Sequence, residues 1–371
     1  MQTKRNCLIL SAAAGLALAA HQAAAATPCN FSATLMSRSC LWESGEEFNA
    51  AMARCATIGS GTERRGCKEA ARRERGEALE TCTAQRHARN AACADLGEVR
   101  YSDPLTDSTI DFIDPDEIGG SWPNNPYVIL QAGHTHVLRA EEEIVIVYAT
   151  DEAREIEGVA CRVVADVVVE EEYDEQEMQW EYTAVEVTDD WFAQDTTGNV
   201  YYCGEVSRNY EDGVLRDLDG SFEAGLELAR GGLLTLAFPM PGDIHRQEYA
   251  LGEAEDIVKY LATDAVPSDD EGGENADFPC APAGGCLKTF DFTPLEPDSS
   301  EYKYYLPGTG FVLAVALEDG EVVEGDREEL ICRGDSLDIL HSENCAVEDP
   351  AGLLDELCSL HHSFCGDAVA Q

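Results

Sequence analysis

The hydrophobic pattern of the chain changes near residue 127. From there to about residue 335, short β-branched and aromatic runs such as "EEIVIVYAT", "GLLTLAF" and "GFVLAVAL" are separated by Gly, Asp and Asn turn signals such as "TTGN" and "LEDGE". Such runs are typical of strands, and closely spaced turns favour antiparallel neighbours. The pattern predicts a mainly antiparallel β domain over 127–335, forming a barrel, a half-barrel or a curved sheet. The segment "GEAEDIVKYLATD" fits either a short helix or one more strand.

A different pattern fills residues 27–97. Ala and charged residues dominate, and six cysteines follow one another in steps of 11, 15, 12, 15 and 11 residues. Steps of 11 and 15 are close to whole numbers of helical turns, so the cysteines of each arm share a face. The sequence predicts a helical hairpin that folds at "TIGSGTE". Its three nested disulfides would be Cys29–Cys93, Cys40–Cys82 and Cys55–Cys67.

The remaining segments complete the predicted α+β organisation. Residues 1–26 have the positive start, apolar stretch and small residues of a secretory signal peptide, so we expect an exported protein of the periplasm or the extracellular medium. Residues 98–126 are rich in Asp, Pro, Gly and Ser and are predicted to form a connector. Residues 336–371 form a tail in which a short helix begins near Pro350.

The cysteine count also indicates export. Of 15 cysteines, Cys7 lies in the signal peptide, and the remaining 14 are an even number suited to disulfides in an oxidising compartment. Within the β domain, Cys161 is predicted to pair with Cys203, and Cys280 with Cys286.

The C-terminal segment holds four cysteines and two adjacent histidines: Cys332, Cys345, Cys358, Cys365, His361 and His362. A continuous helix would place both histidines on one face with Cys358 and Cys365, where soft ligands suit Zn or Cu(I). Disulfides are the simpler interpretation. Because the same helix would hold Cys358 and Cys365 roughly 10 Å apart, each is predicted to pair with Cys332 or Cys345.

Charge divides the chain at the same place as the hydrophobic pattern. The formal net charge is -47, with ten Lys or Arg against nine Asp or Glu in residues 27–97 and 13 against 63 in residues 98–371. Such a field repels nucleic acid and anionic membranes and attracts cations or basic partners. A solvated, lysine-poor surface is the simpler interpretation, because net charge bears on solubility more than on a site.

Two short motifs suggest chemistry. "GDSL" at 334–337 follows a strand-like run, as the nucleophile of a family of serine esterases does, but an Asp-x-x-His pair far downstream is missing, so Ser336 is not expected to be a nucleophile. His134 and His136 in "AGHTHVL" alternate by two and would share one face of a strand. With a carboxylate from a neighbouring strand they could hold Zn or Cu; solvent-facing or packing histidines are the simpler interpretation.

Two further sets of polar residues are candidates for a binding site. Acidic loops such as "DSTIDFIDPDE" and "SDDEGGENAD" do not fit the EF-hand pattern, and a solvated loop is simpler than a weak Ca²⁺ site. Inward-facing charges on a curved sheet would be paired and could form a site. The residues in question are Arg246, Glu248, Glu253, Asp256 and Lys288.

The stretch from "DWFAQDTTGNVYYCGE" to "EYKYYLPGTGFVLAV" resembles a group of uncharacterised exported bacterial proteins over about residues 127–330. The resemblance implies a shared fold and export, and no activity. The segment "YYLPGTGFV" is similar to the last strands of periplasmic half-barrels related to lipoprotein carriers. That second resemblance implies an acyl chain or other apolar ligand on a concave sheet.

Two functions follow as expectations. The first is an exported, non-enzymatic binding or interaction protein that holds an apolar or small ligand on its curved sheet and meets a protein partner through the hairpin. The second is a metal-binding protein or metalloenzyme that uses His134 with His136, or the C-terminal Cys/His cluster. No cofactor is predicted for the first, and a divalent cation (Zn, Cu or Ca) belongs to the second.

Overall fold

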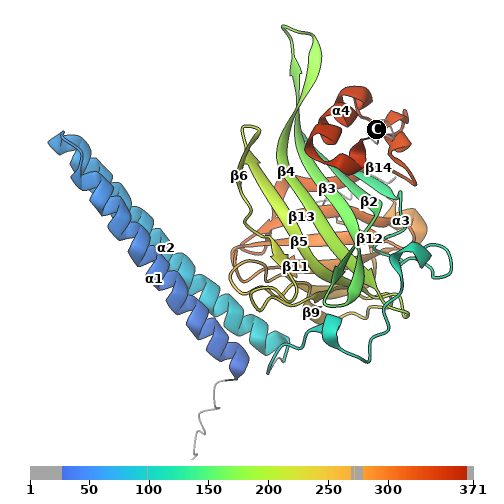
Figure 1. The fold of residues 1–371 in the computed structure, drawn as a ribbon, viewed down its shortest axis with the longest axis horizontal. Coiled ribbons are helices and arrows are strands. Elements are labelled where there is room, and N and C mark those ends of the chain that lie inside the picture. The colour runs from blue at the N-terminus through green and yellow to red at the C-terminus, as the bar shows by residue number, and fades with distance from the viewer. Residues whose placement is uncertain (1–26, 98, 269–270, 272–278, 366–371) are drawn as a thin grey trace, which may run out of the picture.

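A computed structural model describes residues 27–97, 99–268, 271 and 279–365. The predicted signal peptide, most of the acidic loop at 268–277 and the last residues of the tail lie outside the described residues. The fold is α+β, with a helical pair, a large antiparallel sheet and a short C-terminal helix (Figure 1). This confirms the predicted fold class.

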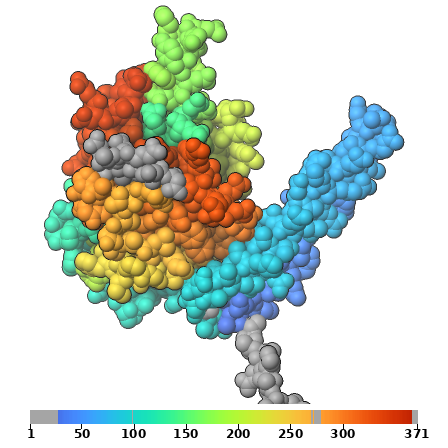
Figure 2. Space-filling view, turned by 180° about the vertical axis from the view of Figure 1, so that it is seen from behind, coloured from blue at the N-terminus to red at the C-terminus, as the bar shows by residue number. Residues whose placement is uncertain are grey.

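The helical pair is the predicted hairpin. Helix α1 (Pro28–Ala56) is capped by Thr27, and α2 (Gly61–Asp95) is capped by Ser60, whose side chain accepts a hydrogen bond from the Glu63 backbone. All three nested disulfides are present: Cys29–Cys93, Cys40–Cys82 and Cys55–Cys67. Figure 2 shows the hairpin as a rod that meets the β domain at one end and projects away from it.

Fourteen strands form one sheet within the described residues. Their bounds are β1 (Thr135–Ala140), β2 (Glu143–Ile156), β3 (Val159–Asp174), β4 (Gln179–Gln194), β5 (Val200–Glu211), β6 (Val214–Asp217), β7 (Phe222–Glu223), β8 (Gly232–Thr235), β9 (Ile244–Arg246), β10 (Ile257–Ala265), β11 (Cys286–Phe292), β12 (Ser299–Leu306), β13 (Gly310–Glu318) and β14 (Glu321–Gly334). The segment "GEAEDIVKYLATD", whose sequence fits either a helix or a strand, therefore contributes most of β10.

The sheet consists of two meanders that meet side by side. Strands β1 to β6 follow one another in space, as do β9 to β14, and antiparallel pairing of β1 with β14 joins the two sets. The far ends of the sheet also approach each other. Strand β8 pairs with β5, Arg230 bridges to Tyr249, and Gln247 Nε2 donates a hydrogen bond to Leu234 O at 3.2 Å. The sheet is thus curled around an interior, which is the strongly curved arrangement that the sequence predicts.

Alternation along the strands gives the sheet two different faces. On the outer face, side chains such as Val167 and Val187 are fully buried beneath Leu353 and Leu357 of α4 (Pro350–Leu360). On the inner face of the same strands lie Val164 and Asp166, described below. The core of the outer face therefore depends on the C-terminal segment, which covers it.

Short helices complete the chain. They are the 3-10 helices η1 (Pro104–Thr106), η2 (Pro115–Glu117), η4 (Leu337–His341) and η5 (His362–Phe364), and the single turn α3 (Cys280–Ala283). The predicted connector packs on the β domain through the buried side chains of Leu105, Ile113 and Ile118. Across the described residues, no helix has both the length and the apolar character that crossing a membrane requires.

The disulfides of the β domain confirm two predictions and correct one. Cys161–Cys203 and Cys280–Cys286 are formed as expected. In the C-terminal segment the pairs are Cys332–Cys345 and Cys358–Cys365, so the predicted cross-pairing is wrong. The reason is that α4 ends at Leu360 and His361 is extended (φ -145°, ψ 126°), which turns the chain back and brings the Cα atoms of Cys358 and Cys365 to 4.6 Å.

Candidate functional site

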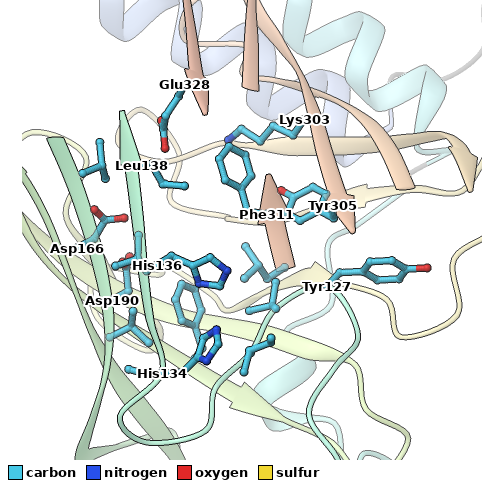
Figure 3. Close-up of a pocket in the computed structure, with 18 of the residues that line it drawn as sticks. Tyr127, His134, His136, Leu138, Asp166, Asp190, Lys303, Tyr305, Phe311 and Glu328 are labelled. Carbon is cyan, nitrogen blue, oxygen red and sulfur yellow. The ribbon is translucent and has the colours of Figure 1, made fainter. Parts of the chain in front are cut away.

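A cavity of about 440 Å³ lies inside the curled sheet. Strands β1 to β4 form one wall, and β12, β13 and β14 contribute to the other (Figure 3). The segment before β1, with Tyr127 and Leu130, closes part of the opening. Cavities of this size, enclosed by a sheet, are the usual place for a small ligand.

The wall on β2, β3 and β4 is mainly apolar because every second residue of a strand faces inward. Val145, Val147 and Ala149 face the cavity from β2, and Val164 faces it from β3. Phe192 continues this surface on β4. The apolar lining is therefore a direct result of strand alternation.

Two aspartates interrupt this apolar wall. Asp166 lies opposite Val147 in the pairing of β2 with β3, and Asp190 lies opposite Val164 in the pairing of β3 with β4. Burial, and then the proximity of the other carboxylate, raises the pKa of Asp166 well above its usual range. Burial likewise raises the pKa of Asp190, although its Oδ1 accepts a hydrogen bond from the Tyr202 hydroxyl.

The two aspartates belong to a larger group of interior acids. Burial raises the pKa of Glu205 to about 8, that of Glu328 to about 7 and that of Asp291 to about 6. The charges of neighbouring carboxylates raise the pKa of each of these acids further. We call this group the acid ring; its members are Asp166, Asp190, Glu205, Glu248, Asp291 and Glu328.

Lys303 is the one Lys or Arg among the described residues that line the cavity. Its Nζ lies 3.1 Å from Glu301 Oε2, and the Glu301 carboxylate raises the pKa of Lys303 well above its usual value. Lys303 lowers the pKa values of Asp166, Asp291 and Glu328 by its charge, but burial outweighs this effect at each of them. A single ammonium thus faces many more carboxyl groups than it can neutralise.

His134 and His136 line the cavity from the start of β1, with ring centroids 4.7 Å apart. His136 Nε2 lies 2.9 Å from Thr309 O, and because a carbonyl only accepts, Nε2 carries the hydrogen. Burial lowers the pKa of His136 to about 4, so the ring is neutral near pH 7. Gly310 makes room for this ring, since a Cβ there would lie 2.9 Å from His136 Nε2.

His134 has one satisfied and one unsatisfied nitrogen. Its Nδ1 lies 3.3 Å from Asp335 Oδ1 and donates to that carboxylate. Its Nε2 is buried and has no hydrogen-bond partner, and the side chain is 4% exposed. Burial lowers the pKa of His134, which leaves Nε2 as a neutral acceptor. Within the "GDSL" motif, Asp335 is therefore the residue with a polar contact to the cavity wall.

The predicted metal residues are arranged differently from the prediction. Among the residues that the structure describes, no three His, Cys, Asp or Glu side chains form a group that could hold a metal ion. His361 Nε2 lies 2.6 Å from Asp189 Oδ1 and His362 Nε2 lies 2.7 Å from Glu152 Oε1, so the two rings bind separate carboxylates. The alternative of a shared helical face with two thiolates does not occur in this structure, because α4 ends before His361 and both cysteines are oxidised, as the simpler interpretation expects.

The five predicted sheet-lining residues lie in different places. Glu248 belongs to the acid ring, whereas Glu253 and Asp256 are exposed, Glu253 in the turn between β9 and β10 and Asp256 directly before β10. Arg246 is buried beside the hairpin, with Nη2 4.0 Å from Cys29 Sγ. Lys288 pairs with Glu271 and lies over the Tyr302 ring, 3.7 Å from its centroid. Of the five, the structure therefore places Glu248 in the acid ring.

Sequence reasoning missed the cavity residues Asp166, Asp190, Lys303 and Glu328. One signal was available in "CRVVADVVVE", where Asp166 interrupts a run of valines at an inward-facing position. A charged residue inside such a run is costly unless it has a partner or a ligand. The meeting of β12 and β14 with β3 across the interior has no comparable signal in the sequence.

Comparisons of the chain with protein-family models, with curated proteins and with solved structures found no match.

Proposed function

We propose that this is an exported, non-enzymatic binding protein that holds a small, partly apolar ligand inside its curled sheet. The observation that carries the proposal is the cavity of about 440 Å³, whose apolar wall is interrupted by a few polar groups. This combination is typical of ligand sites, in which apolar surface supplies binding energy and a few polar atoms fix orientation.

Export is supported by the disulfides. Seven are formed, and they indicate an oxidising compartment such as the periplasm or the extracellular medium. The sequence pattern of residues 1–26 supports the same location. A ligand carried there would be protected from water by the sheet.

Binding of the neutral fluorescent probe N-phenyl-1-naphthylamine tests the proposal. We expect its fluorescence to rise on binding to the wild-type protein. Ala149→Phe, which fills the cavity from β2, should weaken binding about tenfold or more, since it removes the volume that the probe needs. Ala153→Phe is the matched control, because Ala153 is exposed on the same strand.

Circular dichroism shows whether each variant is folded. If Ala149→Phe does not fold, Val168→Phe serves instead, because Val168 lines the cavity and is only partly buried. Probe binding that is the same in a folded cavity-filled variant and in wild type would overturn the proposal, and so would the absence of binding to wild type.

A further inference from the structure

The polar lining of the cavity consists mainly of hydrogen-bond acceptors. The carboxyl groups of Asp166, Asp190 and Glu328 face the interior from β3, β4 and β14. Lys303 already pairs with Glu301, at 3.1 Å. The rest of the acid ring adds carboxyl groups behind Asp190, through Glu205. The interior therefore holds many more carboxyl groups than cations, and each of these groups can become an acceptor by giving up its proton to a more favourable cationic partner.

His134 is a second, independent indication that the ligand carries hydrogen-bond donors. Its Nε2 is buried, has no hydrogen-bond partner and belongs to a side chain that lines the cavity. The bond from Nδ1 to Asp335 fixes the tautomer, so Nε2 offers a lone pair. A buried acceptor without a partner costs free energy that a donor on a ligand would recover. Both the carboxyl groups and this imidazole are thus suited to a ligand with N–H donors.

The apolar wall limits what kind of cation fits. Val145, Val147 and Val164 lie beside the two aspartates, so a bound molecule contacts hydrocarbon and carboxyl groups together. Ca²⁺ requires six to eight oxygen ligands around one point, and the described residues form no such group. A fatty acid would bring a further carboxylate next to the acid ring. An organic cation would pair with the carboxyl groups through its charge and contact the valines through its hydrocarbon part.

We propose that the ligand is a small organic amine, bound as its ammonium with N–H groups toward Asp166 and Asp190 and with its apolar body against the valines of β2 and β3. This inference rests on the proposed function of the cavity and names the class of ligand that the cavity takes.

Displacement of N-phenyl-1-naphthylamine by three molecules of equal chain length tests the inference. The competitors are octylamine, octanol and octanoate, measured at pH 7.5 in a fixed concentration of salt. We expect octylamine to displace the probe at a concentration about tenfold below that of octanol, because charge-assisted hydrogen bonds add to the shared apolar contact. Octanoate should be the weakest of the three.

Variants then show which residues produce the preference for the amine. Asp166→Asn and Asp190→Asn should each weaken octylamine severalfold and leave octanol unchanged, since the amide keeps the shape but cannot ionise to a carboxylate beside the ammonium. Glu172→Gln is the control, because it removes one charge from an exposed position farther along β3. Displacement of the probe by octanol as effective as that by octylamine would overturn the inference while leaving the cavity as a binding site. Failure of the probe itself to bind would instead overturn the proposed function.

Discussion

At the scale of single residues, the adjacent histidines His361 and His362 have different surroundings. The side chain of His361 is 4% exposed and lies against Asp189, which also accepts a hydrogen bond from Arg208 Nη2 at 2.7 Å. The side chain of His362 is 70% exposed. Burial acts to raise the pKa of Asp189, but the hydrogen bonds from His361 and Arg208 outweigh it and lower that pKa to about 2. His361 therefore holds the C-terminal segment on β4.

Replacing each histidine separates these roles. We expect His361→Ala to lower the free energy of unfolding by about 1–3 kcal/mol, because it leaves Asp189 with one partner fewer and opens a gap beneath the tail. His362→Ala should change it by less than about 0.5 kcal/mol, since exposed ion pairs contribute little. Urea denaturation of both variants measures the difference. Equal effects of the two substitutions would contradict this assignment.

The same pair shows where residue-level prediction fails. The spacing of Cys358, His361 and Cys365 fits one face of a helix, and the sequence does place a helix start at Pro350. Where that helix ends is decided by tertiary contacts: His361 leaves the helical conformation and reaches Asp189 on β4. Long-range contacts of this kind have no local signal in the sequence, so the disulfide pairing of the tail was mispredicted.

At the scale of elements, the hairpin is anchored at its base by a buried ion pair. The Arg89 guanidinium donates two hydrogen bonds to Glu255, whose Oε1 also accepts from the Gly252 backbone at 2.8 Å. The side chains of Arg89 and Glu255 are 5% and 1% exposed. Higher on the rod, Arg73 and Glu77 are each 67% exposed. A buried ion pair therefore holds the base of the hairpin on the β domain, whereas the ion pair farther along the hairpin is exposed to solvent.

Glu255→Ala should detach the base of the hairpin. Removing one partner of a buried pair costs about 3–5 kcal/mol, because the other charge stays buried without compensation. We expect faster cleavage by trypsin in the connector at 98–126 and a larger radius of gyration by small-angle X-ray scattering. Glu77→Ala is the control and should leave both unchanged. An unaltered scattering curve for Glu255→Ala would show that other contacts fix the hairpin.

A second element-level prediction concerns the place where the sheet closes. Gly232 begins β8, and a Cβ at this position would lie 1.8 Å from Gln247 O. Gly232→Ala should therefore push β8 away from the segment after β9, destabilise the protein and weaken binding of N-phenyl-1-naphthylamine. Gly120→Ala is the matched control, because the nearest atom to its Cβ would be Glu117 O at 3.6 Å. Thermal unfolding and probe titration of both variants measure the effect.

Elements were more predictable than the contacts between them. The symmetric cysteine spacing predicted the hairpin and its three disulfides, since each arm is a helix with its own periodicity. The alternating runs predicted the antiparallel strands. Pairing of β1 with β14 and the approach of β8 to the segment after β9 join residues more than ten positions apart in ways that alternation does not encode. The cavity depends on those pairings, and it was accordingly predicted only as a concave sheet.

At the scale of the whole molecule, the acid ring makes stability depend on pH. Folding raises the pKa of Glu205 from 4.5 to about 8 and that of Glu328 from 4.5 to about 7. Between these values the folded state binds more protons than the unfolded state, so stability falls as pH rises from about 4 to about 8. Asp189, whose pKa is lowered to about 2, acts in the opposite sense at pH values below about 4. His134, His136 and His245, whose pKa values burial lowers from 6.5, also act in the opposite sense up to about pH 6.5, but the carboxyl groups with raised pKa values outnumber them.

We therefore expect the free energy of unfolding without ligand to be greater at pH 5 than at pH 8. Asp190→Asn should reduce this difference, because it removes one interior group that binds a proton on folding. Glu172→Gln removes the same charge from an exposed site and should leave the difference nearly unchanged, which separates the interior groups from the general repulsion of a chain with a net charge of -47. Urea denaturation at both pH values in 0.5 M NaCl tests this. Stability that rises between pH 5 and pH 8 would contradict it.

The placement of the disulfides has a consequence for proteolysis. Three of them lie within residues 27–97, the other four lie between residues 161 and 365, and none of these seven joins the two parts. A cut in the turn of the hairpin would leave its arms covalently joined by the nested bridges. A single cut in the connector would instead leave the cross-linked hairpin attached to the sheet by non-covalent contacts alone, chiefly the Arg89–Glu255 pair. After such a cut, loss of the buried Arg89–Glu255 pair would be enough to separate the two parts, because no disulfide holds them together.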